Sequence, residues 1–133
     1  MGYVILGVGA AGITAAKTIR KADKETEITM ISTDEQVHSR CMLHKYLSHE
    51  RTAEELNFVP EDFFEANHIN WIKGKTVSGL DTAEKKVKLT DGGEVSYDKL
   101  LIATGAESFI PPVGNLREAG NVFGLRHLRD AAA

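Results

Sequence analysis

Three glycines near the N-terminus have the spacing of a phosphate-binding turn. The segment from Gly7 to Gly12 reads GVGAAG, which is G-x-G-x-x-G, and the small residue Ala16 follows. In such a turn the first glycine permits the tight reversal, and the second lets the backbone approach a pyrophosphate. The third brings the helix close to the strand. The helix that begins there offers N–H groups and a partial positive charge to phosphate oxygens. The alternative is a glycine-rich turn that serves only packing.

The flanking sequence places this turn between a strand and a helix. Tyr3–Leu6 is a short apolar run bounded by glycine, which is typical of a buried strand. Ala10–Ala22 carries apolar residues on one face and lysine or arginine elsewhere, which indicates an amphipathic helix. Glu27–Ser32 has the composition of a second strand. The resulting β-α-β unit needs a crossover connection and therefore predicts parallel strands. In this context the glycine turn predicts nucleotide binding.

Two acidic residues follow the second predicted strand. Asp34 and Glu35 lie about 20 residues beyond the turn, where dinucleotide-binding domains place a carboxylate for the ribose hydroxyls. Asp34 is the preferred candidate, and a solvated loop acid is the alternative for either residue. Two carboxylates at this place also disfavour a ligand with a 2′-phosphate. The pattern up to this point fits NAD as well as FAD.

The rest of the chain predicts short helices and a second set of strands. Helices are expected at Met42–His49 and Pro60–Ala66, and a strand at His68–Ile72. Three further short strands are expected at Thr76–Leu80, Lys86–Leu89 and Glu94–Tyr97. The last two are joined by a TDGG hairpin signal, so we expect an antiparallel meander. Lys99–Ala103 is a continuous apolar run that predicts a buried parallel strand.

Two longer motifs distinguish between the nucleotides. Arg40–Lys45 (RCMLHK) resembles an R-P-x-L-S-K segment, and Tyr97–Ala106 (YDKLLIATGA), followed by Pro111 and Pro112, resembles Y-D-x-L-h-h-A-T-G-A…P-P. Both belong to the FAD-dependent pyridine nucleotide–disulfide oxidoreductases. The chain is most similar to the branch of ferredoxin reductases, rubredoxin reductases and nitrite reductase large subunits. The resemblance runs from about Gly2 to Leu128.

The resemblance implies a fold and an activity. The fold is α/β, with a Rossmann-like parallel sheet, a βαβ fingerprint and an antiparallel β-meander on one face. This is a partial, three-layer FAD/NAD(P)-binding fold. The activity is that of an NAD(P)H-dependent flavin oxidoreductase, in which NAD(P)H is the substrate. FAD passes the electrons to an acceptor, either a small redox protein or another redox centre. Residues 1–115 would form the first segment of a discontinuous FAD-binding domain, and residues 116–133 would lead into an NAD(P)H-binding domain. This chain alone is expected to be inactive.

The resemblance also assigns roles to individual residues. The residues expected to bind FAD are Gly7, Gly9, Ala10, Ala11, Gly12, Asp34, Glu35, Arg40, Lys45, Val77, Ala103, Thr104 and Gly105. Arg40 would contact the ribityl-pyrophosphate part, and the backbone of Val77 would read the adenine edge. Lys45 would be the catalytic residue beside the flavin N5 region, where a cation stabilises negative charge on the reduced flavin. No residue is expected to bind a metal ion.

Departures from the family pattern at two places bear on these roles. The loop from Asp34 to Arg40 is one residue shorter than the usual E-x4-Y-x-R, which leaves the register of Asp34 and Glu35 open. Cys41 and His44 replace the proline and the serine of the R-P-x-L-S-K motif. We expect Cys41 to be a small buried residue near the flavin, with a redox-active thiol as the alternative. His127 is interpreted as a surface or ordinary core residue.

Composition excludes several other functions. The chain has 133 residues, the size of one domain, and its 16 Lys and Arg against 19 Asp and Glu give a net charge of −3. This balance argues against nucleic-acid binding. No apolar run reaches the roughly 18 residues of a membrane span, so no membrane partner is expected. The single cysteine cannot form an intramolecular disulfide, and a cytoplasmic location is expected.

Two other readings of the chain are weaker. One is a free-standing NAD-binding regulatory module. The A-T-G segment at residues 103–105 argues against it. The other is a cofactor-free, non-catalytic fragment whose open strand edges favour self-association. A homo-oligomer is a further expectation that the sequence leaves open.

Overall fold

The structure is a computed structural model that describes residues 2–132 and contains two compact units. The first unit comprises the residues up to Val37 together with Val59–Gly105. The second comprises His38–Phe58 and the residues from Ala106 onward. The glycine turn and all the strands lie in the first unit, whereas the second is built from short helices and loops.

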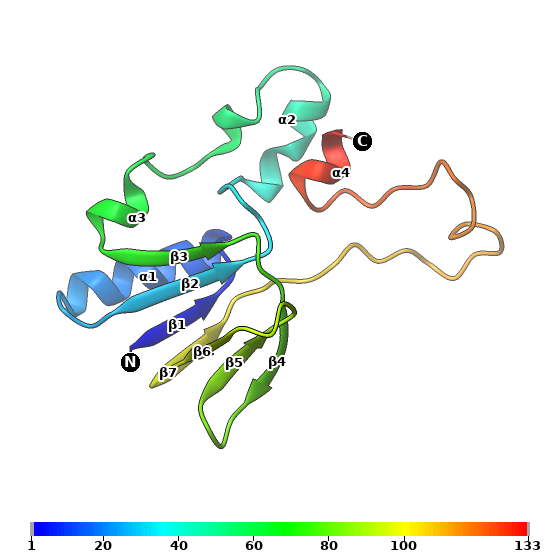
Figure 1. Cartoon of the computed structure of the whole chain (residues 1–133). Coiled ribbons are helices and arrows are strands. Elements are labelled where there is room, and N and C mark those ends of the chain that lie inside the picture. The colour runs from blue at the N-terminus through cyan, green and yellow to red at the C-terminus, as the bar shows by residue number, and fades with distance from the viewer. Residues whose placement is uncertain (1, 133) are drawn as a thin grey trace. The chain divides into compact units, whose positions relative to one another are not determined.

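The first unit is built on a four-stranded parallel sheet with the order β3-β2-β1-β7 (Figure 1). Its strands are β1 (Tyr3–Leu6), β2 (Ile28–Ser32), β3 (Ile69–Lys73) and β7 (Lys99–Ile102). Leu6 at the end of β1 is in register with Ile31 and with Ile102. The carboxyl ends of the strands therefore meet at one edge of the sheet. The predicted parallel β-α-β unit is confirmed.

The sheet is the middle of three layers. One face is covered by α1 (Ala10–Ala22) and α3 (Phe63–Ala66), and the other by a three-stranded antiparallel meander. The meander consists of β4 (Val77–Asp81), β5 (Lys86–Leu89) and β6 (Glu94–Ser96). These elements are close to the predicted ranges, and they confirm the predicted α/β fold with a meander on one face.

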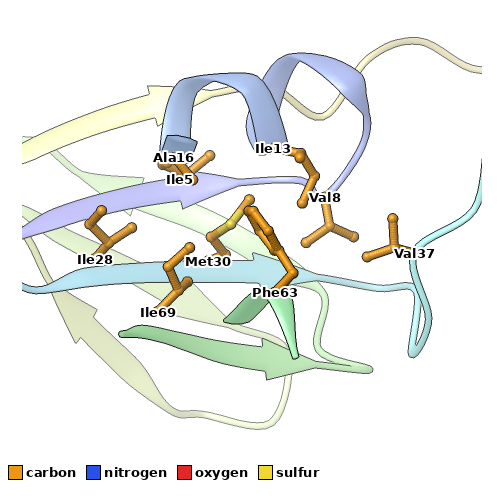
Figure 2. Packing of buried hydrophobic residues seen from close by; sticks show 9 residues of the cluster. All are labelled: Ile5, Val8, Ile13, Ala16, Ile28, Met30, Val37, Phe63 and Ile69. Carbon is orange, nitrogen blue, oxygen red and sulfur yellow. The ribbon is translucent and has the colours of Figure 1, made fainter. Parts of the chain in front are cut away.

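Successive side chains along the strands point to opposite faces of the sheet, so the same strands contribute to a hydrophobic core on each face. Ile5 faces the helices, whereas its neighbours Val4 and Leu6 face the meander. The cluster on the helix side consists of Ile5, Val8, Ile13, Ala16, Ile28, Met30, Val37, Phe63 and Ile69 (Figure 2). The cluster on the meander side consists of Val4, Leu6, Ile31, Val87, Leu89 and Tyr97. Because both faces of the short strands are buried, β1 consists of one aromatic and three aliphatic residues. β2 has three apolar residues together with Thr29 and Ser32, which are buried as well.

A buried arginine ties the end of α1 to two loops. Arg20 is 7% exposed and donates hydrogen bonds to the carbonyl oxygens of Asn67 (2.7 Å), Thr26 (2.9 Å), His68 (3.1 Å) and Asp23 (3.2 Å). These bonds satisfy the charged head within an otherwise apolar layer. They also fix the α1–β2 turn and the start of β3, and thus the orientation of α1 on the sheet.

The prediction that Lys99–Ala103 is buried was wrong. β7 is an edge strand of the described sheet and pairs with β1 alone, so Leu101 is 40% and Ile102 is 60% exposed. An apolar run predicts a strand with two covered faces only when neighbours flank it on both sides. In the described residues, β7 has a neighbour on one side.

The described residues of the second unit form four short helical segments. They are the 3-10 helices Arg40–Met42 and Glu54–Leu56, and the helices α2 (Leu43–Leu47) and α4 (Leu128–Ala132). α2 packs against α4, which brings together segments far apart in the sequence. The predicted helix at Met42–His49 is thus present but shorter, and α4 was not predicted. No helix formed by residues 2–132 has both the length and the apolar character needed to cross a membrane.

Candidate functional site

The glycine turn follows β1 at the carboxyl edge of the parallel sheet. Gly7 has φ of +104°, and a Cβ there would overlap the carbonyl oxygen of Ala103. The Gly7 N–H donates to the Ile31 carbonyl (2.8 Å), and the Ala103 N–H donates to the Leu6 carbonyl (2.8 Å). Only glycine satisfies both the positive φ and the close approach. The glycine turn and the segment after β7 are therefore in close backbone contact.

The two later glycines have opposite surroundings. A Cβ at Gly12 would overlap the carbonyl oxygen of Gly7, so this glycine lets α1 close against the turn. A Cβ at Gly9 would meet no protein atom within 4 Å other than those of its two chain neighbours. Gly9 thus presents open backbone, whereas Gly7 and Gly12 are enclosed by protein. Space beside the middle glycine is what a backbone-bound pyrophosphate requires.

The first turn of α1 is suited to an anion. The helix begins after Gly9, which makes no side-chain cap hydrogen bond, and no acidic residue lies in its first turn. Ala10 and Ala11 are exposed. Backbone N–H groups at such a helix start, together with the helix dipole, attract phosphate oxygens. The residues of the turn that are predicted to bind the cofactor thus lie together at the accessible N-terminus of α1.

The two candidate ribose acids lie in different surroundings after β2. The Ser32 hydroxyl donates to the backbone carbonyl of Asp34 (2.7 Å) and accepts from the Trp71 indole N–H (2.8 Å). Asp34 is half-buried, whereas Glu35 is exposed. Gly74 has φ of +68°, and a Cβ there would lie 3.0 Å from the Glu35 carboxylate. The side chain of Glu35 therefore lies over the β3–β4 connection, while the anchored backbone of Asp34 holds the loop at the end of β2.

The remaining first-unit candidates occupy two places. Ala103 is half-buried and packs on the helix-side core, and the two residues after it, Thr104 and Gly105, are exposed. Gly105 has φ of +74°. Val77 opens β4, opposite Leu89, and packs on the meander-side core. The structure thus brings Ala103 against the glycine turn, whereas Val77 belongs to the meander.

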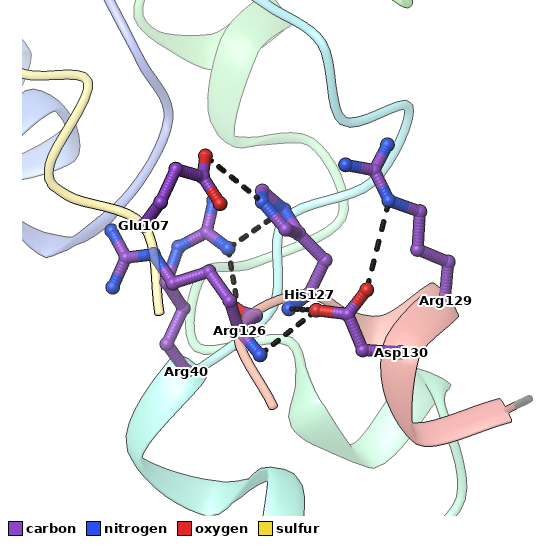
Figure 3. Close-up of polar contacts among 6 residues, drawn as sticks. All are labelled: Arg40, Glu107, Arg126, His127, Arg129 and Asp130. Atoms are coloured by element: carbon purple, nitrogen blue, oxygen red, sulfur yellow. Dashed lines mark hydrogen bonds and ion pairs between the residues drawn. The ribbon is translucent and has the colours of Figure 1, made fainter. Parts of the chain in front are cut away.

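Arg40 and Lys45 lie in the second unit. One terminal nitrogen of Arg40, Nη1, donates to the carbonyl oxygen of Arg126 (2.7 Å) and lies 2.9 Å from His127 Nδ1 (Figure 3). Lys45 Nζ lies 2.5 Å from a Glu50 carboxylate oxygen. The hydrogen bond from Lys45, and then the one from the Ser48 hydroxyl, lower the pKa of Glu50 below its usual value. Lys45 therefore carries a local counter-ion.

Two features of the second unit were missed or misjudged. Cys41 is exposed, which corrects the expectation of a buried residue. It lies in a 3-10 helix whose residues are all at least partly accessible.

His127 and Asp130 form a polar cluster that sequence reasoning did not find. Asp130 accepts from the backbone N–H groups of His127 (2.6 Å) and Arg126 (2.9 Å), as in half of a capping box. The Ser or Thr that usually precedes the helix in a capping box is absent, so the sequence signal for this helix start was weak.

The parallel sheet, the glycine turn and the meander together define an α/β nucleotide-binding fold. The chain belongs to the pyridine nucleotide-disulphide oxidoreductase family, whose model matches residues 1–133. This confirms the resemblance drawn from the two motifs.

Individual relatives extend over nearly the whole chain. It is 34% identical to an NADH oxidase of Methanocaldococcus jannaschii over 140 residues, covering 100% of this chain and 31% of that protein. It is 36% identical to a rubredoxin-NAD(+) reductase of Alcanivorax borkumensis, covering 96% of this chain and 33% of that one. The reductase in a covalent putidaredoxin reductase–putidaredoxin complex superposes with a TM-score of 0.86 at 32% identity, covering 98% of this chain and 32% of that one. The chain thus spans about a third of the length of these relatives.

Proposed function

We propose that this chain is the FAD-binding part of an NAD(P)H-dependent flavin oxidoreductase. The observation that carries the proposal is the contrast within the glycine turn. Gly7 and Gly12 are enclosed by protein, whereas Gly9 presents open backbone at the start of α1. A purely structural turn has no need for an open middle glycine in front of an uncapped helix. A bound pyrophosphate needs both.

Each candidate residue has a separate part in holding the cofactor. The N–H groups of Ala10, Ala11 and Gly12 would donate to the pyrophosphate, and the Asp34 carboxylate would accept from the ribose hydroxyls. Glu35 is the second candidate for the ribose. The small residues Ala103 and Gly105, with Thr104 between them, would let the backbone lie against the cofactor. The backbone of Val77 would read the adenine edge.

The second unit would add the cations. Arg40 would contact the ribityl-pyrophosphate part, where a guanidinium can donate two parallel hydrogen bonds to phosphate oxygens. Lys45 would lie beside the flavin N5 region and stabilise negative charge there. Bound FAD would supply the redox chemistry, accepting a hydride from NAD(P)H and passing electrons on. The protein's share is binding, orientation and charge.

The activity of the whole protein is part of the same proposal. The acceptor would be a small redox protein or another redox centre, in line with the rubredoxin and putidaredoxin named for two relatives. Residues 1–115 would be the first segment of a discontinuous FAD-binding domain, with residues 116–133 leading into an NAD(P)H-binding domain. A cytoplasmic location and a homo-oligomeric state remain predictions, the first supported by the single cysteine.

Calorimetric titration with FAD and, separately, with NAD+ tests the proposal. We expect this chain to bind FAD weakly and in preference to NAD+. The contacts supplied by the rest of the protein are missing, and each lost hydrogen bond costs on the order of 1 kcal/mol. Preference for NAD+ would favour the regulatory module, and binding of neither would favour a cofactor-free fragment. An NADH oxidation assay on the same chain should show no turnover, and steady turnover would refute the discontinuous-domain argument.

A further inference from the structure

Arg40 is held by residues from the other end of the chain. Its Nη1 carries two N–H groups, and the structure gives this nitrogen two acceptors, the Arg126 carbonyl oxygen at 2.7 Å and His127 Nδ1 at 2.9 Å. Both acceptors come from the segment just before α4 (Figure 3). A guanidinium is planar and rigid, so fixing Nη1 at two points also fixes the direction of its other N–H groups.

The contact to Arg40 defines the protonation pattern of His127. A guanidinium always donates, so Nδ1 must accept and carries no proton. The proton of the neutral ring then lies on Nε2, which faces a Glu107 carboxylate oxygen at 3.7 Å. The His127 side chain is 12% exposed, whereas that of Glu107 is 82% exposed. His127 is therefore held mostly out of solvent with its acceptor nitrogen aimed at Arg40.

Asp130 fixes the backbone that presents both acceptors. One carboxylate oxygen accepts from the N–H groups of His127 (2.6 Å) and Arg126 (2.9 Å). Burial alone would raise the pKa of Asp130, but these two hydrogen bonds, together with nearby positive charge that includes Arg129, lower it below its usual value. The carboxylate thus stays charged, and it keeps the peptide groups of residues 126 and 127 in one orientation.

We propose that His127 is a positioning residue that orients the Arg40 guanidinium for the phosphate groups of the cofactor, with Asp130 fixing the segment that carries it. This inference rests on the proposed function, in which Arg40 contacts FAD. It adds a residue that the family motifs did not assign. Without the Nδ1 acceptor, Arg40 would keep its charge, but its Nη1 would lose one of the two acceptors described above. The guanidinium would then spend less time in the orientation that suits the phosphates.

The matched variants are His127→Leu, which removes the acceptor, and His127→Asn, whose Oδ1 can accept where Nδ1 does. FAD titrations of the ¹⁵N-labelled full chain, followed by NMR, give the dissociation constants even when binding is weak. We expect His127→Leu to weaken FAD binding roughly 5- to 30-fold, the effect of about 1–2 kcal/mol, and His127→Asn to restore most of it. In an Arg40→Ala background, His127→Leu should have no further effect on FAD affinity. A purely structural role would give neither the rescue nor the dependence on Arg40.

The outcomes separate the two proposals. If the wild-type chain binds no FAD, the proposed function and this inference both fail. If the wild type binds FAD and His127→Leu binds it equally well, or if the loss persists in Arg40→Ala, only the positioning role fails. Should His127→Leu not fold, the imidazole ¹⁵N shifts of the wild type decide. They should show a protonated Nε2 and an unprotonated Nδ1, and the opposite tautomer would overturn the inference.

Discussion

Replacing Gly9 by valine should remove FAD binding while leaving the fold intact. Gly9 has φ of −75° and ψ of −175°, which any L-residue adopts. A Cβ there would meet no protein atom within 4 Å other than those of its two chain neighbours. The change also reduces the freedom of the unfolded chain, worth about 0.4–1 kcal/mol in favour of folding. This roughly offsets the loss of a preferred helix-capping residue. The free energy of unfolding should therefore change by less than about 1 kcal/mol.

The same substitution should lower the affinity for FAD strongly. The valine side chain would fill the space beside the first-turn N–H groups, and a hydrogen bond to a charged group is worth about 1.5–3 kcal/mol. The loss of even one such bond corresponds to an affinity about 10- to 150-fold lower. Calorimetric titration with FAD measures this change, and thermal unfolding verifies the fold. Unchanged FAD affinity in a folded Gly9→Val chain would refute the assignment of the turn.

Gly12→Ala is the control variant, because it adds a Cβ at an enclosed glycine of the same turn. Its Cβ would overlap the Gly7 carbonyl oxygen, so backbone atoms must move. Such overpacking costs about 1–3 kcal/mol. We therefore expect the thermal midpoint to fall in Gly12→Ala and to stay nearly constant in Gly9→Val. The opposite order of midpoints would show that the turn is packed differently.

Three further predictions concern charged side chains. Asp34→Ala should weaken FAD more than Glu35→Ala in parallel titrations, by about 10- to 150-fold for one charge-assisted hydrogen bond, and the reverse order would shift the ribose site by one residue. Arg20→Met should lower the free energy of unfolding by about 1–3 kcal/mol in urea denaturation, because four carbonyl oxygens lose a buried donor. An unchanged free energy of unfolding would show that water replaces the donor. The lowered pKa of Asp130 means that its stabilising effect is present above its ordinary pKa of 3.8 and is lost as the pH falls through the lower folded value. The difference in thermal midpoint between wild type and Asp130→Ala should thus shrink below pH 3.8, and a difference constant with pH would contradict the assignment.

Elements with strong local patterns were predictable. β1, α1 and β5 match their predicted ranges because short apolar runs, helical periodicity and a hairpin signal are all local features. The parallel arrangement followed from the crossover, and the meander from the TDGG turn. Family membership followed from two motifs whose residue order is more specific than a glycine pattern.

Features that depend on distant neighbours were not predictable. The exposure of Leu101 and Ile102 depends on which strands flank β7, and its own composition does not reveal this. The contact between Arg40 and His127 joins segments far apart in the sequence, and no periodicity connects them. Cys41 was expected to be buried because cysteine usually is. In the structure it is exposed and lies in a 3-10 helix that has no buried residue.

The proposed contact with FAD lies at the open middle glycine and the first turn of α1. Backbone amide shifts recorded as FAD is added to the ¹⁵N-labelled chain test this most directly, because they report the contact residue by residue. We expect the largest shifts on the amides of Gly9, Ala10, Ala11 and Gly12, with smaller shifts in the chain after β7. FAD binding that leaves these amides unchanged, with the shifts concentrated elsewhere in the chain, would contradict it.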